Sequence, residues 1–568
     1  MAILPKKVVL DLGVYVSPPE GRLPFVRLDL NENTVGFPET FKGRDDGFPF
    51  NLYPEYAELV ATIAKMFGVS EANVMLTNGS DEALWVIAHT FVEPAVDKAL
   101  VSDPTFFTIT HSLKLAGATL TAVPTKPDMT FDVNAIGWAL ESGVKVAIFA
   151  SPDNPTGAVL DQQQLMSWCD RFPDTLFVID EAYAEYSNLT LVNCTANYKN
   201  LLAIRSFSKA WGLAGLRLGV VVGDADLLKY LKVVRLPYSV NSAAVSAAQQ
   251  ILTRKEFVLQ QAKQTMERKK GLVQALQSRG YKVIDGGGNF FLLGVGFNSK
   301  EFSQFLRQRG LLVRDRSQGS RPGESILWGF VRIAVGTAAE NQLLLEAIDL
   351  FNAQYAVSFD LDGTLVDTTD SFDKTVDLLV HKYSGAGLTN GELNSLRLEG
   401  GFNNNWDAAE ELLVRRGVRV DRQELEKEAL NFYFGLAKDH EKLMIDLSLL
   451  NTIGKRHPIF IITGRSRMEY DPLWGKTFDR VCNRVYCVDD VPRAKPKPAP
   501  DHIVAMIQNH SLTHGVYIGN SVDDIQSALN AGIHSIGITS TLSGPQLQSA
   551  GAHLILDSPN ELDKVFIL

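Results

Sequence analysis

Short apolar runs alternate with longer amphipathic stretches along almost the whole of this 568-residue chain. Four of the apolar runs lie at residues 145–150, 176–179, 201–204 and 218–222. Alternation of this kind is typical of α/β folds, in which helices connect strands that are mostly parallel. It limits the fold more than any other feature does, because it sets the order of strands and helices along the chain. We therefore predict an α/β fold throughout.

A change of pattern near residue 352 predicts two domains, as the length also suggests. Residues 343–352 have the pattern of a final amphipathic helix, and a new apolar strand begins at Tyr355. We expect a first domain over residues 1–352, a linker around residues 352–354, and a second domain over residues 355–568.

The composition narrows the class of function. The net charge of −10 argues against a nucleic-acid-binding surface as the main function. No apolar run approaches the ~18 residues of a membrane-spanning helix, and the N-terminal segment does not have the pattern of a signal peptide. The four cysteines form no CxxC pair, which favours buried thiols in a reducing compartment. We expect a cytoplasmic protein that acts on small molecules.

A lysine in a run of small and hydroxyl residues, 205–217, gives the first chemical signal. Lys209 supplies the primary amine that a Schiff base with pyridoxal 5'-phosphate (PLP) requires. Ser206, Ser208 and Arg217 supply the hydroxyl and guanidinium donors that suit the phosphate of that cofactor. Taken alone, the run is also compatible with a surface lysine in a glycine-rich loop.

Other fragments supply groups that suit the ring of the same cofactor. Asp180 stands at the end of an apolar run that is predicted to be a strand, and open parallel sheets bind ligands at the carboxyl ends of their strands. Its carboxylate would keep the pyridine nitrogen protonated. Tyr183 would reach the ring hydroxyl, Asn154 would hydrogen-bond the ring oxygen, and Phe106 would stack on the ring face. Each fragment alone has an ordinary alternative as a helix cap, a turn or a core aromatic.

A helix is predicted to begin at Gly79, Ser80 and Asp81, ahead of an apolar-periodic stretch. Backbone N–H groups at a helix N-terminus bind phosphate well. We include these three residues in the predicted cofactor site, although an ordinary capping box explains them equally well in isolation.

In this order and near these spacings, the fragments make residues 1–352 resemble the fold-type I, class I/II PLP-dependent aminotransferases. Such a resemblance implies a large parallel-sheet domain and a small α/β domain, with small-domain parts near residues 1–40 and 250–352. Within the class, the chain resembles the histidinol-phosphate aminotransferases, and the segments that carry this likeness are residues 28–33, Tyr53 with Pro54, and residues 288–291, 312–315 and 331–336.

The resemblance implies several roles. Asn31, Arg314 and Arg332 would bind substrate, and two arginines suit a bidentate clamp on a phosphate or carboxylate. Tyr53 would reach the cofactor phosphate across a subunit interface, which implies a homodimer. The implied reaction is transamination between histidinol phosphate or imidazole acetol phosphate and glutamate or 2-oxoglutarate. Threonine-phosphate decarboxylases resemble the same family, so a decarboxylase or an aminotransferase for another substrate stays an alternative.

Two aspartates directly after the strand at Tyr355 predict a second site. Asp360 and Asp362 stand two residues apart at a strand end, where they can share one Mg²⁺. Asp360 could attack phosphorus, and Asp362 could protonate the leaving oxygen and later activate water. A hydrated acidic turn is the alternative.

Later segments complete a resemblance of residues 355–568 to the haloacid dehalogenase superfamily of phosphatases. Thr463 ends an apolar run and Lys497 offers a cation, with Lys495 as a rival. The resemblance implies that Thr463 and Lys497 bind substrate, that a helical cap covers about residues 372–450 of a Rossmann-like domain, and that the metal ligands are Asp360, Asp362, Asn520 and Asp524.

Asn520 departs from the family pattern, which has aspartate there. An amide ligates Mg²⁺ without adding negative charge, so we expect weaker metal binding unless Asp523 compensates.

The two resemblances in one chain suggest a bifunctional enzyme for consecutive steps of histidine biosynthesis. An aminotransferase of the resembled family makes histidinol phosphate, and a phosphatase would remove its phosphate. The alternatives are a phosphatase for an unrelated metabolite and a regulatory module with an attenuated site, because a fold alone does not fix a substrate.

Overall fold

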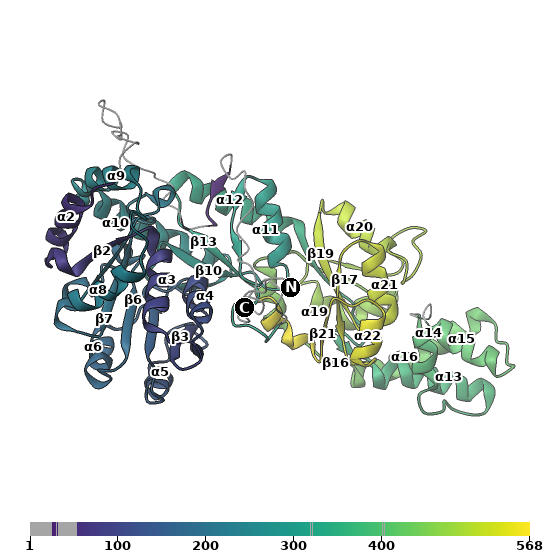
Figure 1. The fold of residues 1–568 in the computed structure, drawn as a ribbon. Helices are drawn as coiled ribbons and strands as arrows, with labels where there is room; N and C mark the ends of the chain where they lie inside the picture. Colours follow the sequence, from purple (N-terminus) through teal and green to yellow (C-terminus); the bar gives the residue numbers. More distant parts are fainter. Residues whose placement is uncertain are drawn as a thin grey trace, which may run out of the picture. The chain divides into compact units, whose positions relative to one another are not determined.

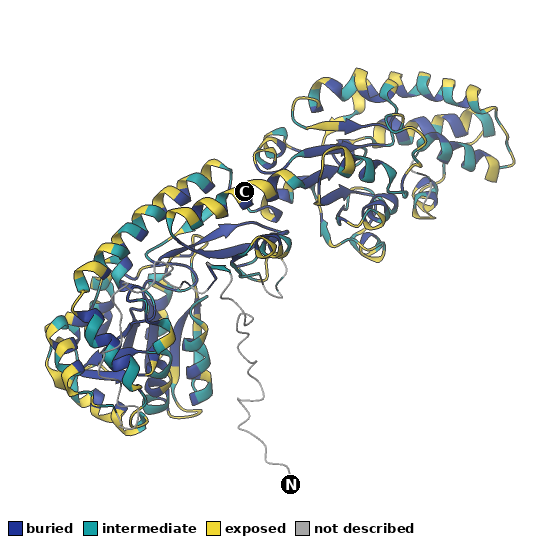
Figure 2. Ribbon diagram, turned by 90° about the horizontal axis from the view of Figure 1, so that it is seen from above, coloured by how far each residue is buried: buried dark blue, intermediate teal, exposed yellow. Residues whose placement is uncertain are grey.

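The computed structural model describes residues 25–29, 31, 54–317, 320, 322–399, 402 and 404–568 (Figure 1). The chain forms two compact units, Met1–Leu345 and Glu346–Leu568. Within each unit the strands are mostly buried and the helices keep an exposed face (Figure 2). Among the described residues, no helix is both long and apolar enough to cross a membrane.

The first unit is built on a seven-stranded sheet in the order β2-β8-β7-β6-β5-β3-β4. Only β8 is antiparallel to its neighbours. The four apolar runs named above form β5 to β8, which confirms the α/β prediction. The strands are β2 (Val74–Thr77), β3 (Lys98–Asp103), β4 (Thr119–Pro124), β5 (Val146–Ala150), β6 (Leu176–Asp180), β7 (Leu201–Ser206) and β8 (Gly219–Gly223).

Amphipathic helices accompany this sheet, and their apolar faces form its core. Buried residues of α3 and α4 pack with those of the central strands in one cluster. The helices of this part are α2 (Ala57–Phe67), α3 (Gly79–Phe91), α4 (Phe107–Ala116), α5 (Val133–Leu140), α6 (Gln162–Arg171), α7 (Ala184–Ser187), α8 (Ala225–Val234) and α9 (Ser242–Leu252).

A smaller antiparallel sheet in the order β12-β13-β10-β9 follows in the same unit. A separate parallel pair joins β1 (Val26–Arg27) to β11 (Leu311–Leu312). The remaining elements are β9 (Lys282–Asp285), β10 (Phe290–Gly294), β12 (Arg314–Asp315), β13 (Phe330–Ala334), α10 (Lys255–Ser278), α11 (Ser299–Gln308) and the first part of α12 (Ala338–Gln354), whose later residues belong to the second unit. Arg314 lies opposite Arg332 in the β12–β13 register.

The linker predicted around residues 352–354 is helical instead. Helix α12 continues to Gln354, and β14 (Tyr355–Phe359) begins at the next residue. The segment Asn-Ala-Gln contains no glycine or proline that would end a helix.

The second unit is built on six parallel strands in the order β18-β17-β14-β19-β20-β21. The strands after β14 are β17 (Ile459–Ile462), β18 (Arg484–Tyr486), β19 (His514–Gly519), β20 (His534–Ile538) and β21 (Leu554–Leu556). Its helices are α17 (Leu447–Gly454), α18 (Arg467–Tyr470), α19 (Lys476–Phe478), α20 (Asp501–Asn509), α21 (Val522–Asn530), α22 (Gly544–Ser549) and α23 (Leu562–Val565).

A helical cap is inserted between β14 and β17. It leaves and returns through an antiparallel pair, β15 (Val366–Asp367) and β16 (Lys442–Leu443). Between these strands lie η4 (Thr369–Asp373), α13 (Lys374–Ser384), α14 (Glu392–Glu399), α15 (Asn405–Arg415) and α16 (Arg422–His440). The cap has its own apolar core, which includes Phe372, Leu412 and Tyr433.

Candidate active sites

A cavity of about 80 Å³ in the first unit brings together most of the residues predicted to bind PLP. It lies where β5, β6 and β7 end and α3 begins, at the carboxyl edge of the sheet. Ten predicted residues line it: Ser80, Asp81, Phe106, Asn154, Asp180, Tyr183, Ser206, Ser208, Lys209 and Arg217. Tyr53 lies outside the described residues.

Asp180 suits the protonated nitrogen of a pyridine ring. Its side chain is buried at the end of β6, and the N–H of Ala182 donates to Oδ1 at 3.1 Å. Burial raises the pKa of Asp180 to about 7, because the charged carboxylate is poorly solvated there. A cationic ring nitrogen beside Asp180 would form an ion pair that stabilises the buried carboxylate.

The other end of the cavity gathers phosphate-binding groups. The guanidinium of Arg217 donates to Ser208 Oγ at 3.3 Å and to Asp81 Oδ2 at 2.9 Å. Gly79 has φ +79°, and a Cβ at this position would lie 2.5 Å from an Arg217 nitrogen. A side chain here would push the guanidinium aside, and the positive φ of this position also favours glycine. The helix N-terminus, two serines and an arginine make a set of donors that fits a phosphate dianion.

Two of the three predicted substrate residues, Asn31 and Arg332, contact residues of this site. Asn31 donates from Nδ2 to the Tyr183 hydroxyl at 2.9 Å. Arg332 is buried and donates to Asn154 Oδ1 at 2.5 Å. Arg314 stands beside Arg332 through the strand register. The Lys209 amine lies 5.8 Å from the centre of the Tyr183 ring.

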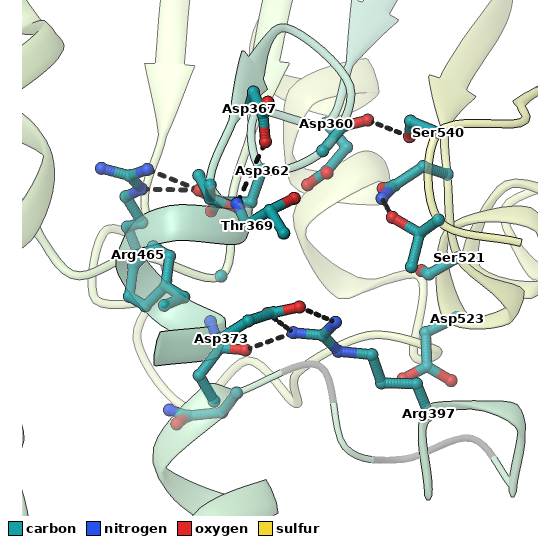
Figure 3. A pocket seen from close by; sticks show the side chains of 18 of the residues that line it. Asp360, Asp362, Asp367, Thr369, Asp373, Arg397, Arg465, Ser521, Asp523 and Ser540 are labelled. Carbon is teal, nitrogen blue, oxygen red and sulfur yellow. Dashed lines mark hydrogen bonds and ion pairs between the residues drawn. The ribbon is translucent and has the colours of Figure 1, made fainter. Parts of the chain in front are cut away.

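A second cavity, of about 260 Å³, lies in the second unit between its sheet and its cap (Figure 3). Asp360 and Asp362 line one side, and an ion pair between Asp373 and Arg397 of the cap lines the other. Asn520 also lines this cavity. A phosphate ester that entered it would meet the predicted nucleophile at one end and cap residues at the other.

Lys497 connects two of the predicted aspartates behind the cavity. Its amine donates to Asp360 Oδ1 at 2.6 Å and to Asp524 Oδ1 at 2.8 Å. Burial favours the neutral amine, but the two carboxylates raise the pKa of Lys497 well above its usual value. Burial and the nearby charge of Asp524 raise the pKa of Asp360. The lysine therefore supplies the positive charge that keeps this buried group of acids together.

A Mg²⁺ ion would find oxygen ligands beside Thr364. The Thr364 hydroxyl lies 3.2 Å from Asn520 Oδ1 and 3.5 Å from Asp360 Oδ2, so these two oxygens face one region. Asp524 instead directs Oδ2 to Ser521 at the start of α21. The buried Asp523 lines the same cavity.

The described residues hold no group of three His, Cys, Asp or Glu side chains arranged for a metal ion. The oxygens of Asp360 and Asn520 beside Thr364 are few, and they suit an ion that keeps several of its waters, as Mg²⁺ does.

Arg465 is a site residue that the sequence did not reveal. It lies two residues after Thr463, and its side chain is only 1% exposed. Its Nε donates to Asp362 Oδ1 at 2.9 Å, while Thr463 Oγ1 donates to Asp362 Oδ2 at 3.3 Å. The signal available was the arginine in the run Thr-Gly-Arg after a buried strand, but that run does not show which acid the arginine reaches.

Two family models match the chain. The model described as aminotransferase class I and II matches residues 7–348. The model described as haloacid dehalogenase-like hydrolase matches residues 357–538. The first matched range lies almost wholly in the first unit, and the second lies within the second unit.

Curated relatives match the first part of the chain. Histidinol-phosphate aminotransferase of Geobacillus sp. is 30% identical over 337 residues, which is 58% of this chain and 90% of the relative. Histidinol-phosphate aminotransferase 1 of Carboxydothermus hydrogenoformans is 31% identical over 330 residues, with 57% and 92% covered.

Solved structures share the fold of this part. The histidinol-phosphate aminotransferase from Sinorhizobium meliloti, in complex with pyridoxal-5'-phosphate, has a TM-score of 0.53 at 22% identity and covers 60% of this chain and 95% of its own. The enzyme from Clostridium acetobutylicum has a TM-score of 0.51 at 20% identity, with 56% and 97% covered.

Proposed function

Because the chain belongs to the class I and II aminotransferases and carries a haloacid dehalogenase-like hydrolase domain after that part, we propose that it is a bifunctional enzyme. The first activity transfers an amino group between histidinol phosphate or imidazole acetol phosphate and glutamate or 2-oxoglutarate. The second is Mg²⁺-dependent hydrolysis of a phosphate monoester, and histidinol phosphate is the substrate that we propose. The names of the relatives support the first substrate.

One observation carries the transaminase proposal: Lys209 shares a cavity with Asp180 and with the donors of a phosphate site. PLP, when bound, supplies an electron sink for the substrate's Cα. Asp180 would hold the ring nitrogen protonated, and Arg217 with its two serines would hold the phosphate. The Lys209 amine would move a proton between the substrate's Cα and the cofactor's C4′. Arg332 and Arg314 would bind the anionic end of the substrate.

The hydrolase proposal rests on Asp360 and Asp362 at one cavity wall. An oxygen of Asp360 attacks phosphorus, the bond from phosphorus to the substrate oxygen breaks, and that oxygen takes a proton from Asp362. Water then attacks the aspartyl phosphate and gives its proton to Asp362, which releases inorganic phosphate and restores Asp360. Lys497 and a bound Mg²⁺ would balance the charge of the phosphoryl group.

We also propose a homodimer in which Tyr53 completes the cofactor site of the partner subunit. The homology to the aminotransferase class supports this arrangement.

Absorbance of the PLP-loaded protein tests the transaminase substrate. Histidinol phosphate should bleach the cofactor band within one turnover, and 2-oxoglutarate should restore it. The Lys209→Ala variant should not complete this cycle. A protein that responds to other amines but not to histidinol phosphate would contradict the assignment.

Release of inorganic phosphate tests the hydrolase. Phosphate should appear from histidinol phosphate with Mg²⁺ and should be lost with EDTA and in the Asp360→Asn variant. Equal release by that variant would show that the activity comes from elsewhere. A wild-type protein that hydrolyses other phosphate esters only would reject the substrate and keep the reaction type.

A further inference from the structure

The guanidinium of Arg465 joins a predicted catalytic group to the cap. Arg465 Nε and one terminal nitrogen donate to Asp362 Oδ1 at 2.9 and 2.5 Å (Figure 3). Its other bonds go to Tyr433 at 2.5 Å and to the two oxygens of Glu441 at 3.0 and 3.2 Å. The five donors of the side chain are all used, so its orientation is fixed by both ends.

The residues at the cap end lie on both segments that connect the cap to the sheet. Glu441 stands between α16 and β16, on the return segment, and is 2% exposed. Phe372, in η4 on the outgoing segment, has its ring centre 4.9 Å from the Arg465 guanidinium. Ser371 donates to Glu441 Oε1 at 2.9 Å, which ties the two segments together.

This arrangement makes the orientation of one carboxylate depend on the cap. Asp362 lines the cavity; its Oδ1 receives two bonds from Arg465, and its Oδ2 receives one longer bond from Thr463. If the cap connectors moved, Arg465 would lose Glu441 and Tyr433 as partners, and Asp362 would lose its fixed direction. Two N–H groups held in one rigid guanidinium converge on Oδ1 and fix its position, and an ammonium has no such fixed pair of donors.

We propose that Arg465 is a positioning residue that aligns Asp362 for proton transfer to the leaving oxygen only while the cap connectors are seated as they are here. This role rests on the proposed phosphatase function. Through Arg465, the position of the cap would control the orientation of the acid in the sheet domain. Arg465 acts through Asp362 and is not itself a group that reacts.

Two substrates with different leaving groups separate this role from a general loss of structure. An alkyl leaving oxygen, as in histidinol phosphate, needs a proton as it departs, whereas the oxygen of p-nitrophenyl phosphate departs as a stable anion. The value of kcat/KM reports the first chemical step for each. The full-length Arg465→Lys and Glu441→Gln variants are compared with the unchanged protein, and their folding is checked by circular dichroism melting.

We expect the ratio of kcat/KM for histidinol phosphate to that for p-nitrophenyl phosphate to fall at least tenfold in Arg465→Lys and at least threefold in Glu441→Gln. The matched control is Arg467→Lys, the same change two residues away. Arg467 pairs with Asp490 and has no bond to Asp362. Its ratio should stay within about twofold.

The outcomes distinguish the positioning role of Arg465 from the phosphatase function on which it rests. If Arg465→Lys lowers both rates by the same factor, the positioning role is wrong and the arginine serves stability alone. If the unchanged protein hydrolyses p-nitrophenyl phosphate but not histidinol phosphate, glycerol 1-phosphate takes its place as the alkyl ester, and only the proposed substrate fails. A protein that hydrolyses none of these esters would overturn the phosphatase function and this role with it.

Discussion

Asp180 sets the chemistry of the first site through burial. A carboxylate whose pKa is raised in the folded state binds protons there that the unfolded state has already lost. Between the ordinary aspartate pKa near 4 and the folded value of about 7, the folded protein therefore holds more protons, and its stability falls as pH rises. This loss applies to the protein without its cofactor, because a cationic ring would stabilise the charged carboxylate.

Urea denaturation of the cofactor-free protein tests this linkage. We expect the first unit to lose about 3 kcal/mol of unfolding free energy between pH 5 and pH 8, because roughly two of the three units of pKa shift fall within this range. The Asp180→Asn variant should lose much less over the same range. The control Asp161→Asn, at the exposed start of α6, should behave like the unchanged protein. Identical pH profiles for all three proteins would contradict the burial argument.

Asn520 sets the charge of the second site. Its Oδ1 faces the region of Asp360, and its Nδ2 donates to Thr541 at 2.7 Å. Replacing the Asn520 amide by a carboxylate adds a negative ligand without added bulk. We expect Asn520→Asp to bind Mg²⁺ at least tenfold more tightly by isothermal titration calorimetry.

A charge added on the cap side of the same cavity is the control for this change. Asn404 caps α15 and lines the same cavity from the cap side, so Asn404→Asp keeps the cap bonds and adds the same charge. Its Mg²⁺ affinity should change less than threefold. Equal gains in the two variants would show a general field effect, and no gain in Asn520→Asp would show that this position does not reach the ion.

At the scale of elements, local patterns predicted the strands well and the contacts between distant segments poorly. The runs that form β5 to β8 are apolar along their length, so their burial is visible in the sequence. The antiparallel direction of β8 is not visible in the sequence, because it depends on pairing with strands that can be far along the chain. The continuation of α12 to Gln354 was missed, although no glycine or proline interrupts that segment.

The same distinction explains which site residues were found. Lys209, Asp180 and Arg217 stand in motifs, and the family matches confirm the resemblance that those motifs indicated. The individual roles of the residues stay predictions. Arg465 was missed because its role depends on Glu441 and Tyr433, which come from the cap and are close only in three dimensions.

The cap helices should behave as a unit with its own core. Leu412 of α15 is 2% exposed in the apolar cluster that α13, α14, α15 and α16 form. We expect Leu412→Ala to destabilise the cap by about 3 kcal/mol and to speed amide hydrogen exchange in these helices. Leu398→Ala, at a 40% exposed position of α14, should cost less than about 1 kcal/mol. Faster exchange spread over the six-stranded sheet, with no preference for the cap, would contradict this view.

At the scale of the whole molecule, the proposed homodimer needs an apolar surface. In the second half of α8 and just beyond it, Tyr230, Val233 and Leu236 are 61%, 85% and 68% exposed. Large apolar side chains gathered in this way mark interaction surfaces. We expect Val233→Glu to shift the dimer toward monomer in sedimentation velocity runs, while Val96→Glu, at a 72% exposed valine before β3, should not. A monomeric unchanged protein with full transaminase activity would contradict the dimer.

The central claim is that one chain carries two consecutive reactions, and a single coupled time course tests it. The PLP-loaded protein is given imidazole acetol phosphate, glutamate and Mg²⁺, and inorganic phosphate is followed. We predict phosphate release after a lag, none from Asp360→Asn, and none from Lys209→Ala until histidinol phosphate is added. Phosphate release by Lys209→Ala without that addition, or its absence from the unchanged protein, would contradict the claim.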